Sequence, residues 1–179
     1  VKIGTDGKID QEDLRSLLRK DTVLVTVNAV DSELGTVQPL ESISNIVREF
    51  PNCSLHVDAT QAIGKTPINL NLADTASIGA HKFYGLSGSG LLYKKSGIAM
   101  EPLIYGGAST TIYRSGTPML ALDASLETAL SLAVEQFEER FARVKELRKN
   151  LQEKLCGYPK VRINSPADAE RDILLGAVN

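Results

Sequence analysis

Two short stretches decide the fold: HVDATQ at residues 56–61 and SIGAHK at residues 77–82. In each, an apolar run ends near a charged side chain, an acid in the first and a lysine in the second. Upstream, a β-branched run at residues 22–29 precedes a helical pattern at 39–50 and an apolar run at 54–57. This alternation predicts a right-handed parallel unit of an α/β sheet. Such sheets place their chemistry at the carboxyl ends of the strands, where the acid and the lysine should meet.

The acid, Asp58, and the lysine, Lys82, together suggest one kind of chemistry. Lys82 follows His81, and partial loss of water in a crevice would make its amine nucleophilic. A nucleophilic lysine with a remote aspartate is the minimum apparatus of an enzyme that uses pyridoxal phosphate (PLP). The lysine forms a Schiff base with the cofactor, and the aspartate keeps the pyridine nitrogen protonated. A second interpretation stays open, because a lysine after a strand is often a solvated loop charge and an aspartate there is often a helix N-cap.

Further motifs stand in order around these two residues. They are LGTVQP at 34–39, HVDATQ at 56–61, GK at 64–65, HKFYG at 81–85 and RSGTP at 114–118. Together they resemble the cysteine desulfurases, which belong to the class V aminotransferase group of fold-type I PLP enzymes. The resemblance covers about residues 25–118, and the order of the motifs makes it much more specific than any one of them.

The resemblance implies a three-layer α/β/α large domain with a mainly parallel sheet, followed by the start of a small α+β domain. We therefore expect residues 1–135 to be part of the PLP-binding large domain. Residues 136–179 would form a connecting helix and the truncated start of the C-terminal domain, with strands at 160–164 and 173–178. The helical pattern over residues 119–155 carries an apolar stripe, which we interpret as packing: Phe137, Phe141, Val144, Leu147, Leu151 and Leu155. The two ends of the sequence suggest a piece of a longer protein.

The resemblance also implies roles for single residues. Lys82 would be the Schiff-base residue, and His81 would bind the cofactor phosphate or orient the lysine. Asp58 would pair with the pyridine N–H, and Gln61 would hydrogen-bond the phenolic oxygen of PLP. Thr117 would reach across a dimer interface to the phosphate in the neighbouring subunit, which predicts a homodimer.

At three places the sequence departs from the family pattern. Ser32 stands where the family has an asparagine that hydrogen-bonds the phenolic oxygen, and a serine reaches less far. Gly79 stands where the family has a phosphate-binding serine, so Ser77 or a backbone N–H would have to replace that contact. Residues 109–111 replace an amide, acid and basic cluster with Ser-Thr-Thr.

The function that the resemblance implies is conversion of L-cysteine to L-alanine. The sulfur passes to an enzyme cysteine as a persulfide and then to an acceptor or scaffold protein, for iron–sulfur cluster or thio-cofactor synthesis. Neither Cys53 nor Cys156 occupies the position of that nucleophile, which falls past residue 179, so the fragment alone is not expected to complete the cycle. The alternatives are a selenocysteine lyase, a transaminase, or a non-catalytic PLP-fold scaffold protein.

Composition excludes other classes of function. The net charge of −2 and the 23% of charged residues give no basic block for nucleic acid, and no apolar run is long enough to span a membrane. The two cysteines and two histidines form no metal-binding pattern, and the expectation is that no metal is bound. Free thiols without a leader suggest the cytoplasm. Gly64-Lys65-Thr66 resembles the end of a P-loop, but Ala59 replaces the first glycine that this motif requires.

Overall fold

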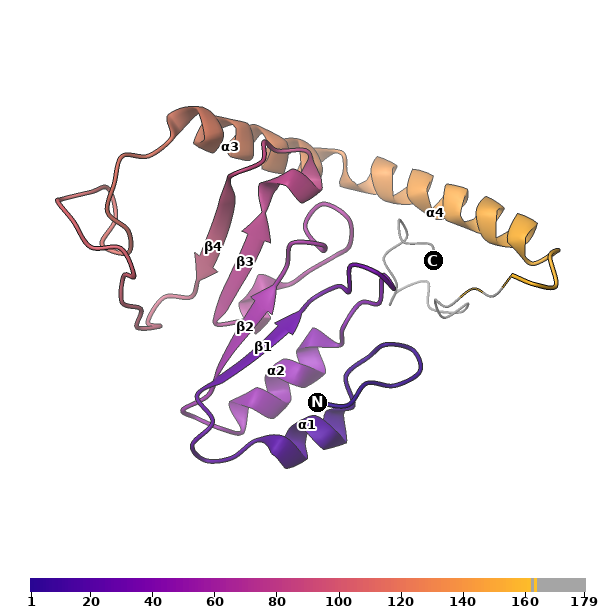
Figure 1. Cartoon of the computed structure of the whole chain (residues 1–179), viewed down its shortest axis with the longest axis horizontal. Coiled ribbons are helices and arrows are strands. Elements are labelled where there is room, and N and C mark those ends of the chain that lie inside the picture. Colours follow the sequence, from indigo (N-terminus) through magenta and orange to yellow (C-terminus); the bar gives the residue numbers. More distant parts are fainter. Residues whose placement is uncertain (162, 164–179) are drawn as a thin grey trace.

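The computed structural model describes residues 1–161 and 163, which are built around a four-stranded sheet in the order β1-β2-β3-β4 (Figure 1). Strands β1 (Leu24–Asn28), β2 (Ser54–Asp58) and β3 (Thr75–Gly79) are parallel. Strand β4 (Gly90–Lys94) pairs antiparallel with β3. The prediction of an α/β fold with a mainly parallel sheet is confirmed.

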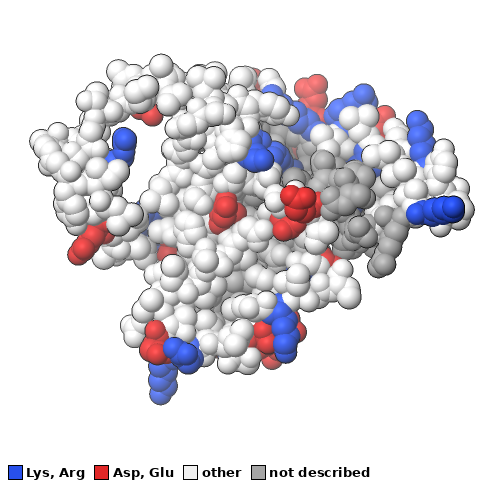
Figure 2. Space-filling model, viewed as in Figure 1, with Lys and Arg blue, Asp and Glu red and all other residues white. Residues whose placement is uncertain are grey.

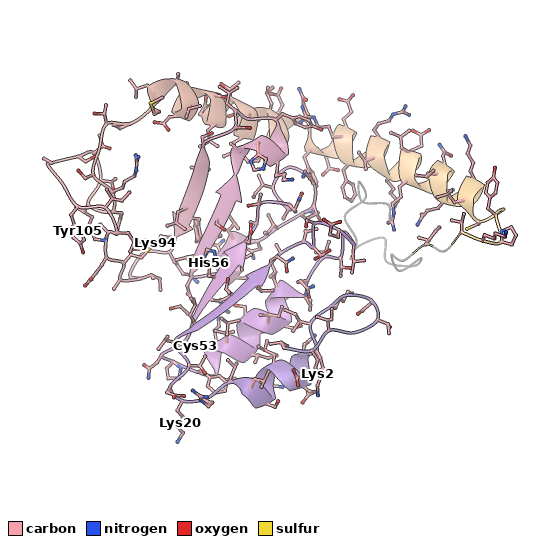
Figure 3. All side chains as sticks on the ribbon, viewed as in Figure 1. Lys2, Lys20, Cys53, His56, Lys94 and Tyr105 are labelled. Carbon is pink, nitrogen blue, oxygen red and sulfur yellow. The ribbon has the colours of Figure 1, made fainter. Side chains whose placement is uncertain are left out.

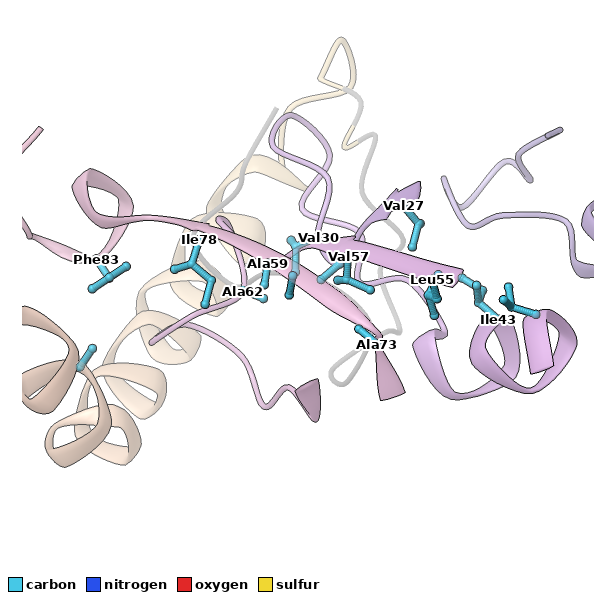
Figure 4. Close-up of a cluster of buried hydrophobic side chains, with 14 of the residues drawn as sticks. Val27, Val30, Ile43, Leu55, Val57, Ala59, Ala62, Ala73, Ile78 and Phe83 are labelled. Carbon is cyan, nitrogen blue, oxygen red and sulfur yellow. The ribbon is translucent and has the colours of Figure 1, made fainter. Parts of the chain in front are cut away.

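The two faces of the sheet differ in chemistry. One face carries aliphatic side chains such as Leu55, Val57 and Ile78, which are buried in the cluster that Figure 4 shows. The other face carries polar side chains, and there His56 Nδ1 lies 2.8 Å from Thr75 Oγ1. Because burial of one aliphatic side chain stabilises a fold by about 1.5–3 kcal/mol, the apolar face holds the sheet to its helices.

Two helices lie before β2 in the sequence, and the second confirms the helical pattern predicted at residues 39–50. Helix α1 (Gln11–Leu17) begins at Asp10, whose carboxylate accepts two backbone N–H groups of the first turn. Helix α2 (Leu40–Arg48) places Ile43 and Val47 in the buried cluster and packs on β2. The described residues thus supply the sheet and a helical layer on its apolar face.

The helical pattern at residues 119–155 forms two helices instead of one. Helix α3 (Leu120–Glu135) ends at Gln136, which has the non-helical angles φ −97° and ψ 11°, and α4 (Phe137–Leu155) begins directly after it. Helix α4 continues well beyond the sheet (Figure 1). The break coincides with the predicted domain division between residues 135 and 136, and that division stays a prediction.

Other predictions at this level meet mixed outcomes. The sequence predicts a buried strand at residues 22–29, but Leu24 of β1 is 54% exposed while Val27 is 7% exposed. Within the described residues β1 pairs only with β2, and a β-branched run does not distinguish an edge strand from a central one.

Two strands were also predicted near the C-terminal end. Residues 173–178 lie outside the described part of the chain. Residues 162 and 164, which belong to the strand predicted at 160–164, also lie outside the described part. The described residues of that range form no strand.

Two short 3₁₀ helices flank β3 on either side. Helix η1 (Leu70–Leu72) precedes β3, and η2 (Ala80–Phe83) follows it directly and therefore begins at the carboxyl edge of the sheet.

Over the described part of the face in Figure 2, Lys and Arg side chains are interspersed with Asp and Glu. None of the helices within residues 1–161 has the length and apolar character needed to cross a membrane.

The turn after β2 packs closely against α3 at Gly64. This residue has φ +70°, and a Cβ added to it would lie 2.9 Å from the Cβ of Ala133. We expect Gly64→Ala to lower the free energy of unfolding by about 2–5 kcal/mol, the sum of left-handed backbone strain and overpacking. Urea denaturation of the full-length protein would measure this loss.

Gly97 provides a matched control for that substitution. It has φ +88°, but a Cβ there would meet no atom within 4 Å. Gly97→Ala should therefore lose only the strain, about 1–2 kcal/mol. Equal losses for the two variants would contradict the packing of Gly64 against α3.

Candidate active site

A cleft of about 680 Å³ lies between the turn after β2, the η2 turn and the start of α4. Three of the predicted site residues, Ser32, Gln61 and Lys82, line this cleft. The α4 wall consists of Gln136, Glu139, Arg140, Phe141, Arg143 and Val144. The fold thus brings side chains from four separate segments to one cavity. A smaller cleft of about 430 Å³ is lined mainly by α3 and does not include Gln61 or Lys82.

The lysine side chain enters the cleft from η2. Lys82 is exposed, and the turn that carries it is closed by a hydrogen bond from Gly85 N to Ala80 O at 3.0 Å. Tyr84 has φ 72°, the left-handed region that non-glycine residues rarely adopt, and backbone strain of this kind is common at functional sites. The guanidinium carbon of Arg140 lies 5.0 Å from the centre of the Tyr84 ring, so α4 holds the lysine-bearing turn.

Gly79, at the end of β3, makes room for its neighbours. A Cβ on Gly79 would lie 3.1 Å from Thr60 Cγ2 and 3.3 Å from His81 Cε1. Its N–H donates to Thr60 Oγ1 at 3.2 Å. The sequence suggested that an unspecified backbone N–H could replace the phosphate contact of the missing serine; the N–H of Gly79 has an acceptor within the protein. Gly79 therefore contributes space for His81 and Thr60, and its hydrogen bond ties the ends of β2 and β3 together.

Asp58 ends β2, one strand away from the lysine. It lies opposite Ser77 in the register between β2 and β3, at the same edge of the sheet as η2. Its carboxylate is exposed, and Oδ1 accepts a hydrogen bond from Thr60 N at 2.9 Å, which fixes the side chain. Asp58 is not part of the wall around Lys82.

Two other predicted residues are not brought to the cleft. Ser77 Oγ lies 3.3 Å from His56 Nε2, so its hydroxyl contacts the polar face of the sheet. Thr117 is exposed on the segment that precedes α3. Neither position tests the predicted contacts with the cofactor phosphate. The contact predicted for Thr117 is made to the phosphate of a second subunit.

Sequence reasoning missed parts of the cleft wall. Lys65 was considered only as part of the GK motif and in the comparison with a P-loop, yet its ammonium donates to Gln61 Oε1 at 2.9 Å. The spacing of four residues between them was the available signal. The stripe on α4 was interpreted as packing, and the rings of Phe137 and Phe141 do stack at 5.5 Å. However, Phe141 and Val144 also line the cleft, which periodicity alone does not show.

Among the titratable side chains that line the cleft, Lys65 has a pKa that is shifted by its surroundings. Burial lowers the pKa of Lys65 below its ordinary value of 10.5, and the charge of Lys82 lowers it further. Between the lowered pKa and 10.5, the unfolded chain binds more protons at this residue than the folded chain does. The free energy of unfolding therefore gains a contribution from Lys65 as the pH rises through this window.

This linkage gives a test by pH. Lys65→Met lacks the titrating group, so the stability of the wild type should rise relative to the variant as the pH is raised. Urea denaturation of both proteins from about pH 7 to 10 would measure the difference. A difference that stays constant, or that moves toward the variant, would contradict the burial of the Lys65 ammonium.

A lysine delivered by a strand end to a cleft, beside a strand that ends on an aspartate, is the arrangement expected at a PLP site in an open α/β fold. The chain belongs to the aminotransferase class-V family, whose family model matches residues 1–178. Enzymes of this family depend on PLP.

The matching relatives agree with this assignment. A NifS/IcsS protein homolog from Lactobacillus delbrueckii subsp. bulgaricus is 37% identical over 95% of the chain, which covers 45% of that relative. The cysteine desulfurase IscS of Dictyoglomus turgidum is 36% identical over 83% of the chain, which covers 38% of it. A solved NifS-like protein superposes with a TM-score of 0.91 at 35% identity, over 98% of this chain and 48% of that one. The chain thus spans less than half the length of these relatives.

Proposed function

We propose that the full-length protein is a PLP-dependent cysteine desulfurase, which removes the sulfur of L-cysteine and leaves L-alanine. The observation that carries this proposal is the convergence of Lys82, Gln61 and Ser32 on one cleft, with Asp58 at the neighbouring strand end. The similarity to a protein named cysteine desulfurase supports the choice of substrate. The proposal concerns the full-length protein because the chain spans only part of its relatives.

The residues of the site fit PLP. An amine, an amide and a hydroxyl line one cleft, and the cation Arg140 suits a group with an anionic phosphate. The Asp58 carboxylate suits a protonated ring nitrogen. The volume of about 680 Å³ falls within the range of about 300–1,000 Å³ that is usual for small-molecule sites. Among residues 1–161 and 163, no group of three His, Cys, Asp or Glu side chains could hold a metal ion.

Each residue has a defined task in this proposal. When bound, PLP supplies an electron sink for the substrate. Lys82 would hold the cofactor through its Nζ atom, and a free Nζ at this position would be able to take up and return a proton. Asp58 would keep a proton on the pyridine nitrogen. The Gln61 amide would donate to the phenolic oxygen, and Ser32, which lines the same cleft, would add a second donor.

The sulfur step balances with one enzyme thiol. L-Cysteine and an enzyme thiol give L-alanine and an enzyme persulfide, so the sulfur atom moves between two thiols without an outside oxidant. The thiol belongs to a cysteine of the full-length protein other than Cys53 and Cys156. A sulfur-acceptor or scaffold protein then receives the persulfide sulfur. Cytoplasmic location is part of this proposal, and the two free thiols of the described chain support it.

The active protein is proposed to be a homodimer. The segment between β4 and α3 stands away from the sheet, as the position of Tyr105 in Figure 3 shows. Its apolar side chains are open to solvent: Leu103 is 97% exposed and Ile112 is 81% exposed. A second subunit would cover these side chains and bring Thr117 to its phosphate.

The test is product formation by the purified full-length protein. With added PLP and a thiol reductant, L-cysteine should yield equal amounts of sulfide and alanine. Alanine from selenocysteine alone would identify a selenocysteine lyase, and a keto acid product would identify a transaminase. Failure of the full-length protein to bind PLP would overturn the proposal and leave the non-catalytic scaffold protein.

A further inference from the structure

Lys65 is a cleft residue to which the proposed chemistry gives no task. It is half-buried, it lines the same cleft as Lys82, and its Nζ atom lies 2.9 Å from Gln61 Oε1. Burial of a lysine is unfavourable unless the ammonium has an acceptor, and Gln61 provides one. This hydrogen bond accounts for how the ammonium tolerates burial. It does not explain why a lysine lines the cleft.

The local backbone brings the two side chains together. In the turn after β2, Ile63 N bonds to Ala59 O at 3.1 Å and Thr66 N bonds to Ala62 O at 3.0 Å, which are helical hydrogen bonds between residues four apart. Gln61 and Lys65 are also four apart, so their side chains leave the same side of the turn. The packing of this turn on α3 at Gly64 fixes its position.

The chemistry of the two groups determines how the amide lies. A glutamine side chain presents an oxygen at one end and an NH₂ group at the other, and it can rotate by half a turn when nothing distinguishes them. A lysine ammonium only donates, so the end that faces Lys65 must be the oxygen. The NH₂ group is then left for the cleft.

We propose that Lys65 is a positioning residue that holds the Gln61 amide with its NH₂ group toward the cleft, ready to donate to an anionic oxygen of the cofactor. The inference rests on the proposed function, because it assumes that PLP occupies the cleft. Without Lys65 the amide would sample both orientations, and one of them would direct an oxygen at the anionic acceptor.

The test is a double-mutant cycle on PLP affinity, measured by titration of the full-length protein. Lys65→Met, which keeps the aliphatic stem, should weaken PLP binding by about 10-fold, as should Gln61→Ala. If Lys65 acts through Gln61, the double variant should bind no more than about 2-fold more weakly than Gln61→Ala alone. The absorption band of bound PLP should shift in Lys65→Met, since the donor at the phenolic oxygen is disturbed.

Two further variants separate positioning from general effects. Lys65→Arg retains a donor-only cation and should restore the wild-type absorption band. Lys149→Met removes an exposed lysine of α4, whose ammonium lies 3.9 Å from the Glu153 carboxylate, and should change neither affinity nor spectrum. Circular dichroism of the ligand-free proteins confirms that each variant is folded.

The outcomes distinguish this inference from the proposed function. If the wild type binds PLP and Lys65→Met keeps the same affinity and spectrum, the inference is wrong and the proposed function stands. Single losses that multiply in the double variant would show that Lys65 does not act through Gln61, which also overturns the inference. A wild type that binds no PLP overturns both.

Discussion

Replacing Lys82 with alanine should abolish borohydride-stable attachment of PLP to the full-length protein and lower its desulfurase activity by roughly 10³-fold or more. The reason is that Lys82 is the lysine that the end of β3 delivers to the cleft. Lys65 lines the same cleft, but its ammonium is bound to Gln61 Oε1. Mass spectrometry after borohydride treatment would locate the attachment.

Two companion variants make this test specific. Lys82→Arg keeps the positive charge without a nucleophilic amine, so it should lose attachment as completely as alanine does. Lys149→Ala, on the exposed surface of α4, should label and react like the wild type. Attachment that persists on another lysine in Lys82→Ala would show that the cleft has been assigned the wrong Schiff-base residue.

Much of the fold could be predicted because local signals agreed with one another. The run into Asp58, the run into Lys82 and the helix between the first strands all point to one parallel sheet, and the structure has it. The break at Gln136 coincides with the domain division that the resemblance implied, but the helical pattern over residues 119–155 does not itself mark it. The antiparallel direction of β4 could not be predicted, because a short apolar strand looks alike in both directions.

The candidate site was predictable where it follows strand ends, and only there. The family resemblance implied that Gln61 and Ser32 share a cofactor site with Lys82, and the structure finds all three around one cleft. The hydrogen bond from Gly79 N to Thr60 and the contact of Arg140 with Tyr84 depend on backbone positions from distant segments. No periodicity or composition contains that information, so it comes from the three-dimensional structure alone.

Asp58→Asn should lower kcat by on the order of 10²-fold while PLP remains attached to Lys82. Asparagine has the same shape, and its oxygen can still accept the Thr60 N–H that Oδ1 accepts at 2.9 Å, so the strand end should keep its structure. What is lost is the negative charge that keeps the pyridine nitrogen protonated. The cofactor would still bind, but it would withdraw electrons from the substrate less well. Steady-state kinetics and borohydride labelling measure the two effects separately.

Asp74 provides a matched control for the charge of Asp58. Its Oδ2 atom also accepts a backbone N–H, from Leu55 at 2.8 Å, but Asp74 precedes β3 and so lies at the edge of the sheet opposite the cleft. Asp74→Asn should alter stability and leave kcat within about 2-fold of the wild type. If both variants lose kcat alike, the effect of Asp58 is a general consequence of removing a carboxylate charge from the sheet and not an action on the cofactor ring. If only Asp58→Asn does, the carboxylate at the end of β2 acts on the cofactor ring, because the two substitutions remove the same charge from equivalent backbone contacts.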